Sequence, residues 1–205
     1  MPSRRRLLSF ALAVSVAAGG AAVAAAPAPS GMLPAQPGDM SLGSPKAKVQ
    51  VVEYASLSCP HCARFNADVF PAFKAKYVDT GQVRYTFREM LTPPAEVAAA
   101  GFMLARCAGP DKYFKVVDEV FRSQSRWDGD IKPIFLGIAK NNGLSEAQFE
   151  SCLSSKANLE GINARVKSAL DSGVSSTPTF FINGKKIEGE QTLEKLDAAI
   201  TAARK

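Results

Sequence analysis

The sequence is poor in the side chains that usually bind metals. It has one histidine, His61, and four cysteines among 205 residues. A tetrahedral zinc site takes about four ligands, so all four cysteines would have to converge from separate parts of the chain. A c-type haem attachment needs a histidine after the second cysteine of a Cys-X-X-Cys pair, and Ala63 stands there instead. We therefore expect neither a metal site nor a cofactor.

Long hydrophobic runs are missing everywhere except at the N-terminus. There, three arginines starting at Arg4 precede the uncharged stretch LLSFALAVSVAAGGAAVAAA, which ends in small residues. This pattern predicts a signal peptide over residues 1–26, cleaved after Ala24 or Ala25, and hence an exported protein. Both the Sec and the twin-arginine export routes stay open, and the alternative is an uncleaved anchor. The absence of cysteine near the cleavage region excludes a lipoprotein anchor.

Clusters of basic charge are missing from the rest of the chain. The formal net charge is +6, and removal of the three signal arginines leaves 22 basic against 19 acidic residues, a net charge of +3. The remaining lysines are scattered, which predicts an ordinary solvated surface and no nucleic-acid partner. The chain also has no internal repeat, and its length suits one hydrophobic core, or one core with a satellite.

The first half of the remaining chain predicts a strand, a helix and a second strand. Residues 27–47 are rich in Pro, Ala, Gly and Ser and predict a flexible lead-in. The β-branched run VQVVEYAS predicts a buried strand, and apolar side chains then recur at helical spacing through residues 58–78, where Pro71 predicts a kink. QVRYTFREM predicts a second strand, parallel to the first through a right-handed crossover. This βαβ unit predicts an α/β fold.

The second half predicts a group of helices, a hairpin and a final helix. Helical patterns separated by Gly or Pro cover 95–108, 111–124, 131–141, 145–154 and 158–171. TPTFFING and KKIEGE predict two strands joined by a turn at Asn183, and TLEKLDAAITAARK predicts a helix capped by Thr192. We therefore divide the chain into one unit formed by 48–92 and 173–205, and a helical insertion at 93–172.

The stretch ASLSCPHCARF places two cysteines where the first strand meets the helix. Cys59 falls at or just before the helix N-terminus, where unpaired N–H groups and the helix dipole stabilise a thiolate. Cys62 lies one turn further on, close enough to close a disulfide and to resolve mixed disulfides. Pro60 suits the first helical turn, and His61 can donate to the Cys59 sulfur or, when protonated, face it. Because a stable thiolate favours the reduced form, the disulfide should be a strong oxidant.

A structural staple is the alternative to a reactive pair. A disulfide between Cys59 and Cys62 would enclose only two residues. Such a short loop restricts the unfolded chain very little, so the bridge would add little stability. The spacing therefore favours a reactive pair.

CPHC at a strand-to-helix junction, the later TPTFFINGK and the helical insertion together resemble the DsbA family of thioredoxin-like periplasmic thiol oxidants. The resemblance covers residues from about 46 to 205. It implies a thioredoxin-like fold with a helical insertion domain, and an oxidase that donates the Cys59–Cys62 disulfide to reduced exported proteins. It also implies a monomer that a membrane quinone-linked, DsbB-like partner reoxidises. The open alternatives are a disulfide reductase or isomerase, and a non-catalytic periplasmic binding or chaperone module.

The resemblance assigns a substrate-binding role to two residues far from the cysteines. Pro178 matches the cis-proline that stands against the disulfide in this family, and Thr177 would offer its backbone groups to an extended substrate peptide. The alternative for Pro178 is an ordinary trans proline at the start of a strand. Many oxidases of the family carry Val at the position of Thr177, whereas the isomerases more often carry Thr, which leaves the substrate preference open.

Glu53 matches the buried acid that lies beneath the active site in the same family. It stands in the first predicted strand between Val52 and Tyr54, an unusual place for an acid. The resemblance implies that it relays a proton to Cys62, with a pKa raised by burial. The alternative is a strand position that faces solvent.

Cys107 and Cys152 lie in two predicted helices of the insertion, each on an apolar background. An oxidising compartment favours a structural disulfide between them over two unpaired buried thiols. The bridge would close a loop of 44 intervening residues and stabilise the fold by roughly 3 to 4 kcal/mol. It is not part of the family's core pattern.

Overall fold

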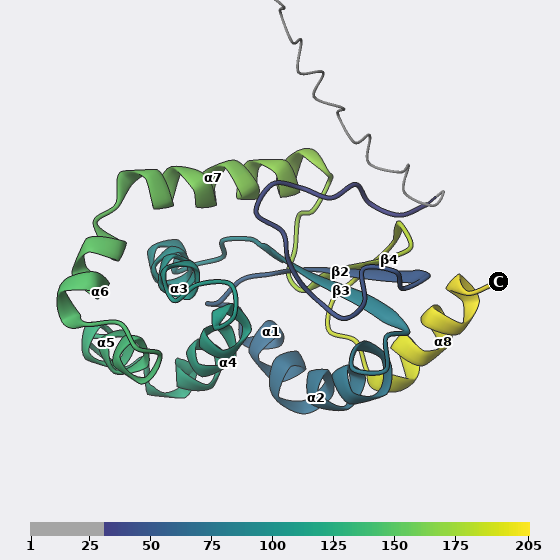
Figure 1. Cartoon of the computed structure of the whole chain (residues 1–205), viewed down its shortest axis with the longest axis horizontal. Helices are drawn as coiled ribbons and strands as arrows, with labels where there is room; N and C mark the ends of the chain where they lie inside the picture. Colours follow the sequence, from purple (N-terminus) through teal and green to yellow (C-terminus); the bar gives the residue numbers. More distant parts are fainter. Residues whose placement is uncertain (1–30) are drawn as a thin grey trace, which may run out of the picture.

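A five-stranded sheet forms the centre of the computed structural model, which describes residues 31–205. Helices cover both faces of the sheet, and a group of helices extends from one end of it (Figure 1). The predicted α/β architecture with a helical insertion is confirmed. The signal peptide predicted for residues 1–26 lies outside the described residues.

The sheet has the strand order β1-β3-β2-β4-β5. Its strands are β1 (Met40–Leu42), β2 (Val49–Ala55), β3 (Val83–Glu89), β4 (Thr179–Ile182) and β5 (Lys185–Glu188). β2 and β3 are parallel, as a right-handed crossover requires, and all other neighbours are antiparallel. Asn183 and Gly184 connect β4 to β5 with φ values of 43° and 79°. Because a tight primed turn needs positive φ at both positions, the Asn-Gly pair fixes this hairpin.

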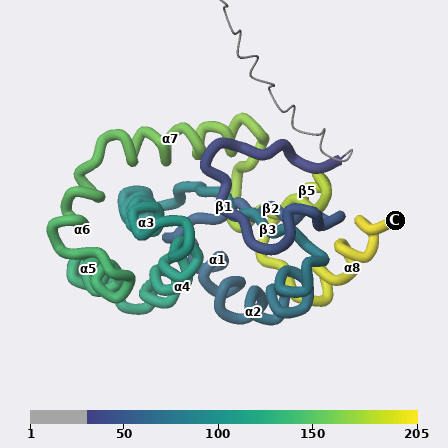
Figure 2. The backbone as a smooth tube through the Cα atoms, in the orientation of Figure 1, coloured from purple at the N-terminus to yellow at the C-terminus, as the bar shows by residue number. Residues whose placement is uncertain are grey.

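The segment 31–47 differs from the flexible lead-in that the sequence predicted. It contains β1, which pairs with β3, and it folds back along the strands in Figure 2. The buried Arg88 side chain donates to the Asp39 carboxylate at 2.8 Å and to the Pro34 carbonyl at 2.7 Å. A three-residue strand is too short to show an alternating pattern, and its partner lies far along the chain. The flexible lead-in predicted from composition is therefore wrong for residues 31–47.

The chain from Pro60 to Val78 is helical but not regular. α1 (Pro60–Arg64) and α2 (Phe70–Phe73) alternate with two π-helical turns, η1 (Phe65–Val69) and η2 (Lys74–Val78). Pro71 lies in the first turn of α2. A proline ring clashes with the preceding turn of a regular α-helix, and a wider π turn relieves this clash. The irregularity predicted at Pro71 therefore takes the form of widened turns on either side of it.

Five helices connect β3 to β4. They are α3 (Ala95–Cys107), α4 (Tyr113–Ser123), α5 (Lys132–Asn141), α6 (Glu146–Leu153) and α7 (Lys156–Asp171), with a short 3-10 turn, η3 (Gln124–Arg126), after α4. Ser145 and Gln148 cap each other's backbone N–H groups at the start of α6. α7 differs from the other four because it packs on β3 and covers one face of the sheet (Figure 1). The insertion therefore contributes to the sheet's own core.

The last helix, α8 (Leu193–Ala203), follows β5. It begins after Thr192, whose side chain accepts the N–H of Lys195, so the predicted cap is present. α8 packs on β4. In Figure 1 it lies beside α2, across the sheet from α7.

The sheet separates two apolar clusters. The smaller cluster lies on the α7 side and is formed by Val52, Tyr54, Met90, Ala169, Val174 and Phe181. The larger cluster contains Val51, Ala55 and Cys62 and continues into the helical insertion. Successive side chains of a strand point to opposite faces, so Glu53 shares its face with Val51 and Ala55. That is the face against which Cys62 packs.

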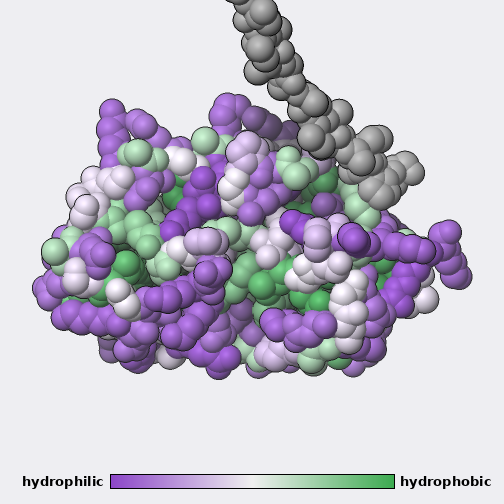
Figure 3. Space-filling view, viewed as in Figure 1, coloured by the Kyte–Doolittle hydropathy of each residue, from purple (hydrophilic) through white to green (hydrophobic). Residues whose placement is uncertain are grey.

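The surface has few large exposed apolar side chains. The face seen in Figure 3 is mostly hydrophilic, with apolar side chains scattered between polar ones. Among residues 31–205, the strongly exposed large apolar side chains are Leu159 and Leu170, both on α7. None of the helices in this range is long and apolar enough to cross a membrane.

Candidate active site

Cys59 caps the helix that follows β2. Its backbone is extended, with φ −82° and ψ 119°, as an N-cap position requires. Its sulfur accepts the backbone N–H of Cys62 at 3.4 Å. Pro60 takes the first helical position, where its missing N–H leaves no bond unmade. The structure thus places Cys59 at the helix N-terminus, where the sequence predicted it.

The loop before Cys59 is held by residues that the sequence did not indicate. The Ser58 hydroxyl donates to the Thr92 carbonyl at 2.7 Å. The Gln124 amide, from the insertion, donates to the carbonyl of Leu57 at 2.7 Å and to that of Cys59 at 3.3 Å. No motif marks Gln124, because a glutamine after a helix is common and its target lies 65 residues away. These bonds fix the direction in which the Cys59 side chain leaves the loop.

Thr177 and Pro178 lie directly against Cys59. The peptide bond between them is cis. The Cys59 thiol donates to the Thr177 carbonyl with 3.4 Å between sulfur and oxygen. The fold therefore brings together two segments that are 118 residues apart in the sequence. β4 begins one residue after Pro178, so the sheet itself positions this segment.

The surroundings of Cys59 favour its thiolate. A hydrogen bond from the Cys62 thiol is the main cause that lowers the pKa of Cys59, which falls to about 5 against the opposing effect of burial. The backbone N–H groups of Cys62 and His61 lower it further. Each of these donors stabilises negative charge on the sulfur. Cys59 is consequently ionised at neutral pH when the pair is reduced.

Cys62 and Glu53 lie deeper and favour their protonated forms. Burial, the bond with Cys59 and the charge of Glu53 together raise the pKa of Cys62 well above its usual value. Glu53 is 2% exposed, and burial raises its pKa to about 8 although a hydrogen bond from Tyr85 acts in the opposite direction. The Tyr85 hydroxyl lies 2.5 Å from the Glu53 carboxylate. The site therefore combines an ionised outer sulfur with a protonated inner sulfur and a protonated acid.

Tyr85 is a second site residue that the sequence did not indicate. It stands in β3, and its register partner in β2 is Val51, two residues before Glu53 on the same face. Aromatic residues are common in strands, so its identity alone carried no signal. Only the pairing of β2 with β3 places its hydroxyl on the Glu53 carboxylate.

The His61 side chain turns away from the predicted position beside the Cys59 sulfur. Its ring is 59% exposed, and its Nδ1 atom lies 3.2 Å from the Glu190 carboxylate. The Arg64 guanidinium contacts the same ring nitrogen and donates to Glu190 at 2.9 Å. The contribution of His61 to the acidity of Cys59 thus comes from its backbone N–H. Local sequence could not reveal Glu190, which lies 129 residues away.

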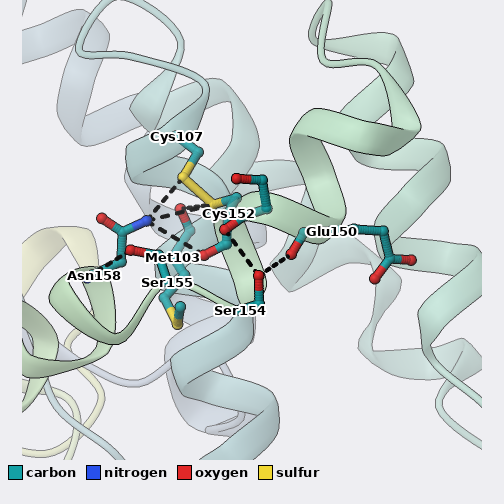
Figure 4. The surroundings of a disulfide bond; sticks show 8 residues. Met103, Cys107, Glu150, Cys152, Ser154, Ser155 and Asn158 are labelled. Atoms are coloured by element: carbon teal, nitrogen blue, oxygen red, sulfur yellow. Dashed lines mark hydrogen bonds between the residues drawn. A yellow bond between two sulfur atoms is a disulfide. The ribbon is translucent and has the colours of Figure 1, made fainter.

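Cys107 and Cys152 form a disulfide that ties the end of α3 to α6. Their sulfurs are 2.01 Å apart. The Asn158 amide, from the first turn of α7, donates to the Cys107 sulfur at 3.3 Å and to the Cys152 carbonyl at the same distance (Figure 4). Cys152 is 5% exposed. The disulfide and its contacts with Asn158 therefore join α3, α6 and α7 to one another.

Comparison with known proteins places this arrangement in a family. The family model described as Thioredoxin matches residues 35–202. The crystal structure of Wolbachia pipientis alpha-DsbA1 is 30% identical in sequence and superposes with a TM-score of 0.76. The match covers 85% of this chain and 96% of that one. The chain belongs to the DsbA family. This family of thioredoxin-like oxidoreductases is the one that the sequence resembled.

Two further relatives of this DsbA-family chain bear on its fold and length. A protein of Rickettsia typhi, named as a protein-disulfide oxidoreductase, is 31% identical over 169 residues. That match covers 80% of this chain but 62% of the relative, so the chain spans about three fifths of its length. BdbD from Bacillus subtilis, in its oxidised form, is 22% identical with a TM-score of 0.71, over 80% of this chain and 92% of that one. At this identity the likeness shows the shared fold.

Proposed function

We propose that this protein is a thiol:disulfide oxidase that donates the Cys59–Cys62 disulfide to reduced, exported proteins. The observation that carries the proposal is the inequality of the two sulfurs. The pKa of Cys59 is lowered to about 5, and that of Cys62 is raised well above its usual value. An unequal pair gives a disulfide one good leaving group and one sulfur that prefers to remain protonated.

In the first step, a substrate thiolate attacks the Cys59 sulfur of the oxidised pair. A new bond forms between the substrate sulfur and Cys59, and the bond between Cys59 and Cys62 breaks with its electrons moving to Cys62. Glu53, protonated at neutral pH because its pKa is about 8, is the proton source for the Cys62 thiolate. The positioning of its carboxyl by Tyr85 supports this role.

In the second step, another substrate thiolate attacks the substrate sulfur of the mixed disulfide. A disulfide forms within the substrate, and Cys59 leaves as a thiolate that its hydrogen-bond donors stabilise. The substrate loses two electrons, and the Cys59–Cys62 pair gains them. Because Cys59 is a good leaving group, the balance lies towards oxidised substrate.

Substrate binding is proposed at the segment that faces Cys59. Thr177 and Pro178 lie beside the sulfur and offer an extended peptide an edge with which to pair. A surface depression near Cys59 is lined in part by its chain neighbour Pro60, by Phe121 and by Gln124. A chain crossing Cys59 would contact both surfaces.

The remaining parts of the proposal concern the cell. The predicted signal peptide supports a periplasmic location, and exported proteins are then the substrates. Each cycle leaves the cysteine pair reduced, and the acceptor that we propose for its two electrons is a membrane quinone-linked partner of the DsbB kind. We propose that the protein works as a monomer, since a single chain supplies both cysteines, Cys59 and Cys62, and the groups that contact the Cys59 sulfur.

Redox titration against glutathione tests the direction of the reaction. We expect a midpoint potential far more oxidising than that of thioredoxin, together with rapid oxidation of a reduced test protein. Cys59→Ser should abolish this activity, whereas the double substitution Cys107→Ser with Cys152→Ser should keep it. A midpoint as reducing as that of thioredoxin would sink the oxidase proposal.

Refolding of a scrambled protein separates the alternatives. An isomerase, which Thr177 brings into consideration, should recover scrambled substrate, whereas an oxidase should recover little of it. If Cys59→Ser left the activity in cells intact, a non-catalytic binding or chaperone module would be the better description.

A further inference from the structure

The Glu190 carboxylate contacts two side chains on the outer side of α1, those of His61 and Arg64. The carboxylate lies 3.2 Å from Nδ1 of His61 and 2.9 Å from the Arg64 guanidinium. Partial burial works to raise the pKa of Glu190, but the hydrogen bonds from Arg64 and His61 outweigh it and lower that pKa below its usual value. The carboxylate is therefore ionised and available as a partner for both side chains.

The backbone around Glu190 is fixed next to the active site. The Gly189 N–H donates to the Pro178 carbonyl at 2.9 Å. The buried Gln191 amide donates to the carbonyls of Gly189 at 2.8 Å and Glu188 at 3.1 Å. The loop that carries Glu190 is thus tied to the segment whose Thr177 carbonyl meets the Cys59 sulfur. The Glu190 backbone therefore cannot shift away from α1 without breaking these hydrogen bonds.

We infer that Glu190 is a positioning residue that holds the His61 ring on the outer side of α1, away from the Cys59 sulfur. The inference rests on the proposed function and deepens it. His61 stands between the two cysteines, and its ring is bonded to Glu190 and Arg64. Without the carboxylate, the ring would be free to turn and donate a hydrogen bond to the Cys59 thiolate.

The consequence is a limit on oxidising strength. A ring N–H beside a thiolate stabilises the charged sulfur. A more stable thiolate favours the reduced pair, so the disulfide becomes a stronger oxidant. Glu190 therefore keeps the Cys59–Cys62 disulfide less oxidising than it would be with the His61 ring beside the Cys59 sulfur.

The variant Glu190→Gln tests this inference, because it keeps the side-chain size and removes the charge. We expect the equilibrium constant for oxidation of glutathione by the Cys59–Cys62 disulfide to rise about two- to fivefold, the range typical of exposed ionic contacts. The pKa of Cys59, followed by the ultraviolet absorbance of its thiolate, should fall in parallel. Glu188→Gln is the matched control, since Glu188 lies two residues away and pairs with Lys186. It should leave both quantities unchanged.

The same substitution in a His61→Gln protein shows whether Glu190 acts through the His61 ring. The change caused by Glu190→Gln should disappear when His61 is already replaced by Gln, which keeps its own backbone N–H. If the change persists in that background, Glu190 acts on the sulfur directly and the inference is overturned. It is also overturned if Glu190→Gln alters neither the equilibrium nor the Cys59 pKa in a protein that still oxidises substrates. A wild-type protein without oxidase activity would instead contradict the proposed function.

Discussion

The two cysteine pairs of this chain place the same side chain in two different environments. Cys59 and Cys62 are free thiols one helical turn apart, whereas Cys107 and Cys152 form a disulfide between two helices. The first pair is surrounded by hydrogen-bond donors to one sulfur and by a buried acid near the other. The second pair has an amide donor at Cys107 and encloses a long loop.

The difference teaches that chain separation and local donors, more than the residue type, decide what a cysteine pair does. A disulfide that encloses two residues adds little stability, and one that encloses a long loop adds several kcal/mol, about 3 to 4 in the chain-entropy model. Unequal acidity favours exchange at the first pair. Each pair therefore suits only one of the two roles, and the predictions below test this separation.

Removal of the second disulfide should have the largest effect on stability. For Cys107→Ala with Cys152→Ala we expect the free energy of unfolding to fall by about 3 to 4 kcal/mol, because the sequence separation of 45 residues frees a long loop in the unfolded chain. Urea unfolding of both proteins measures this change. The rate of substrate oxidation should stay the same. A loss of oxidation in a folded double variant would break the separation between the two pairs.

Glu53→Gln should stabilise the protein at alkaline pH. The pKa of Glu53 is raised from 4.5 to about 8, so the unfolded chain releases this proton first as the pH rises. The wild-type protein therefore loses stability between pH 4.5 and about 8, and the full cost remains above pH 8. The variant should be more stable than the wild type by several kcal/mol above pH 8 and nearly equal to it below pH 4.5.

The same variant should also exchange disulfides more slowly, because Gln cannot supply a proton to Cys62. Urea unfolding at several pH values and stopped-flow oxidation of a reduced peptide measure the two effects. Glu188→Gln, at an exposed position of β5, serves as the control for both. An unchanged pH profile of stability would contradict a raised pKa for Glu53.

Thr177→Val should have the smallest effect. The Thr177 hydroxyl is buried and has no hydrogen-bond partner among residues 31–205. Replacing an unpaired buried hydroxyl with a methyl group of similar size should raise the free energy of unfolding by about 1 kcal/mol. Thermal unfolding of the two proteins compares them. Equal or lower stability of the variant would mean that the hydroxyl has a partner after all.

Much of the fold could be predicted because its elements are long and periodic. The helices of the insertion begin and end within about two residues of their predicted limits, since Gly, Pro and capping side chains mark those limits. β1 was missed because three residues cannot show a period. The π turns around Pro71 were foreseen only as a kink, because sequence says where a regular helix fails but not how it adapts.

The candidate site, too, was predicted only in part from the sequence. The position of Cys59 at a helix start follows from the local order of strand, cysteine and helix. Tyr85, Gln124 and Glu190 were not foreseen, because each reaches the site through a distant element of the fold. The direction of the His61 ring was predicted wrongly for this reason, since its partner Glu190 stands beyond β5.

The sequence by itself determined that this chain carries two cysteines one turn apart at the start of a helix in an α/β fold. That information is local, because a helix N-terminus acts on the residue that caps it. Only the tertiary structure decided the environment of the pair: Thr177 against one sulfur, Glu53 on the side of the other, and His61 held outwards by Glu190. The physical reason is that burial and hydrogen bonding depend on neighbours in space, which the order of residues alone does not reveal.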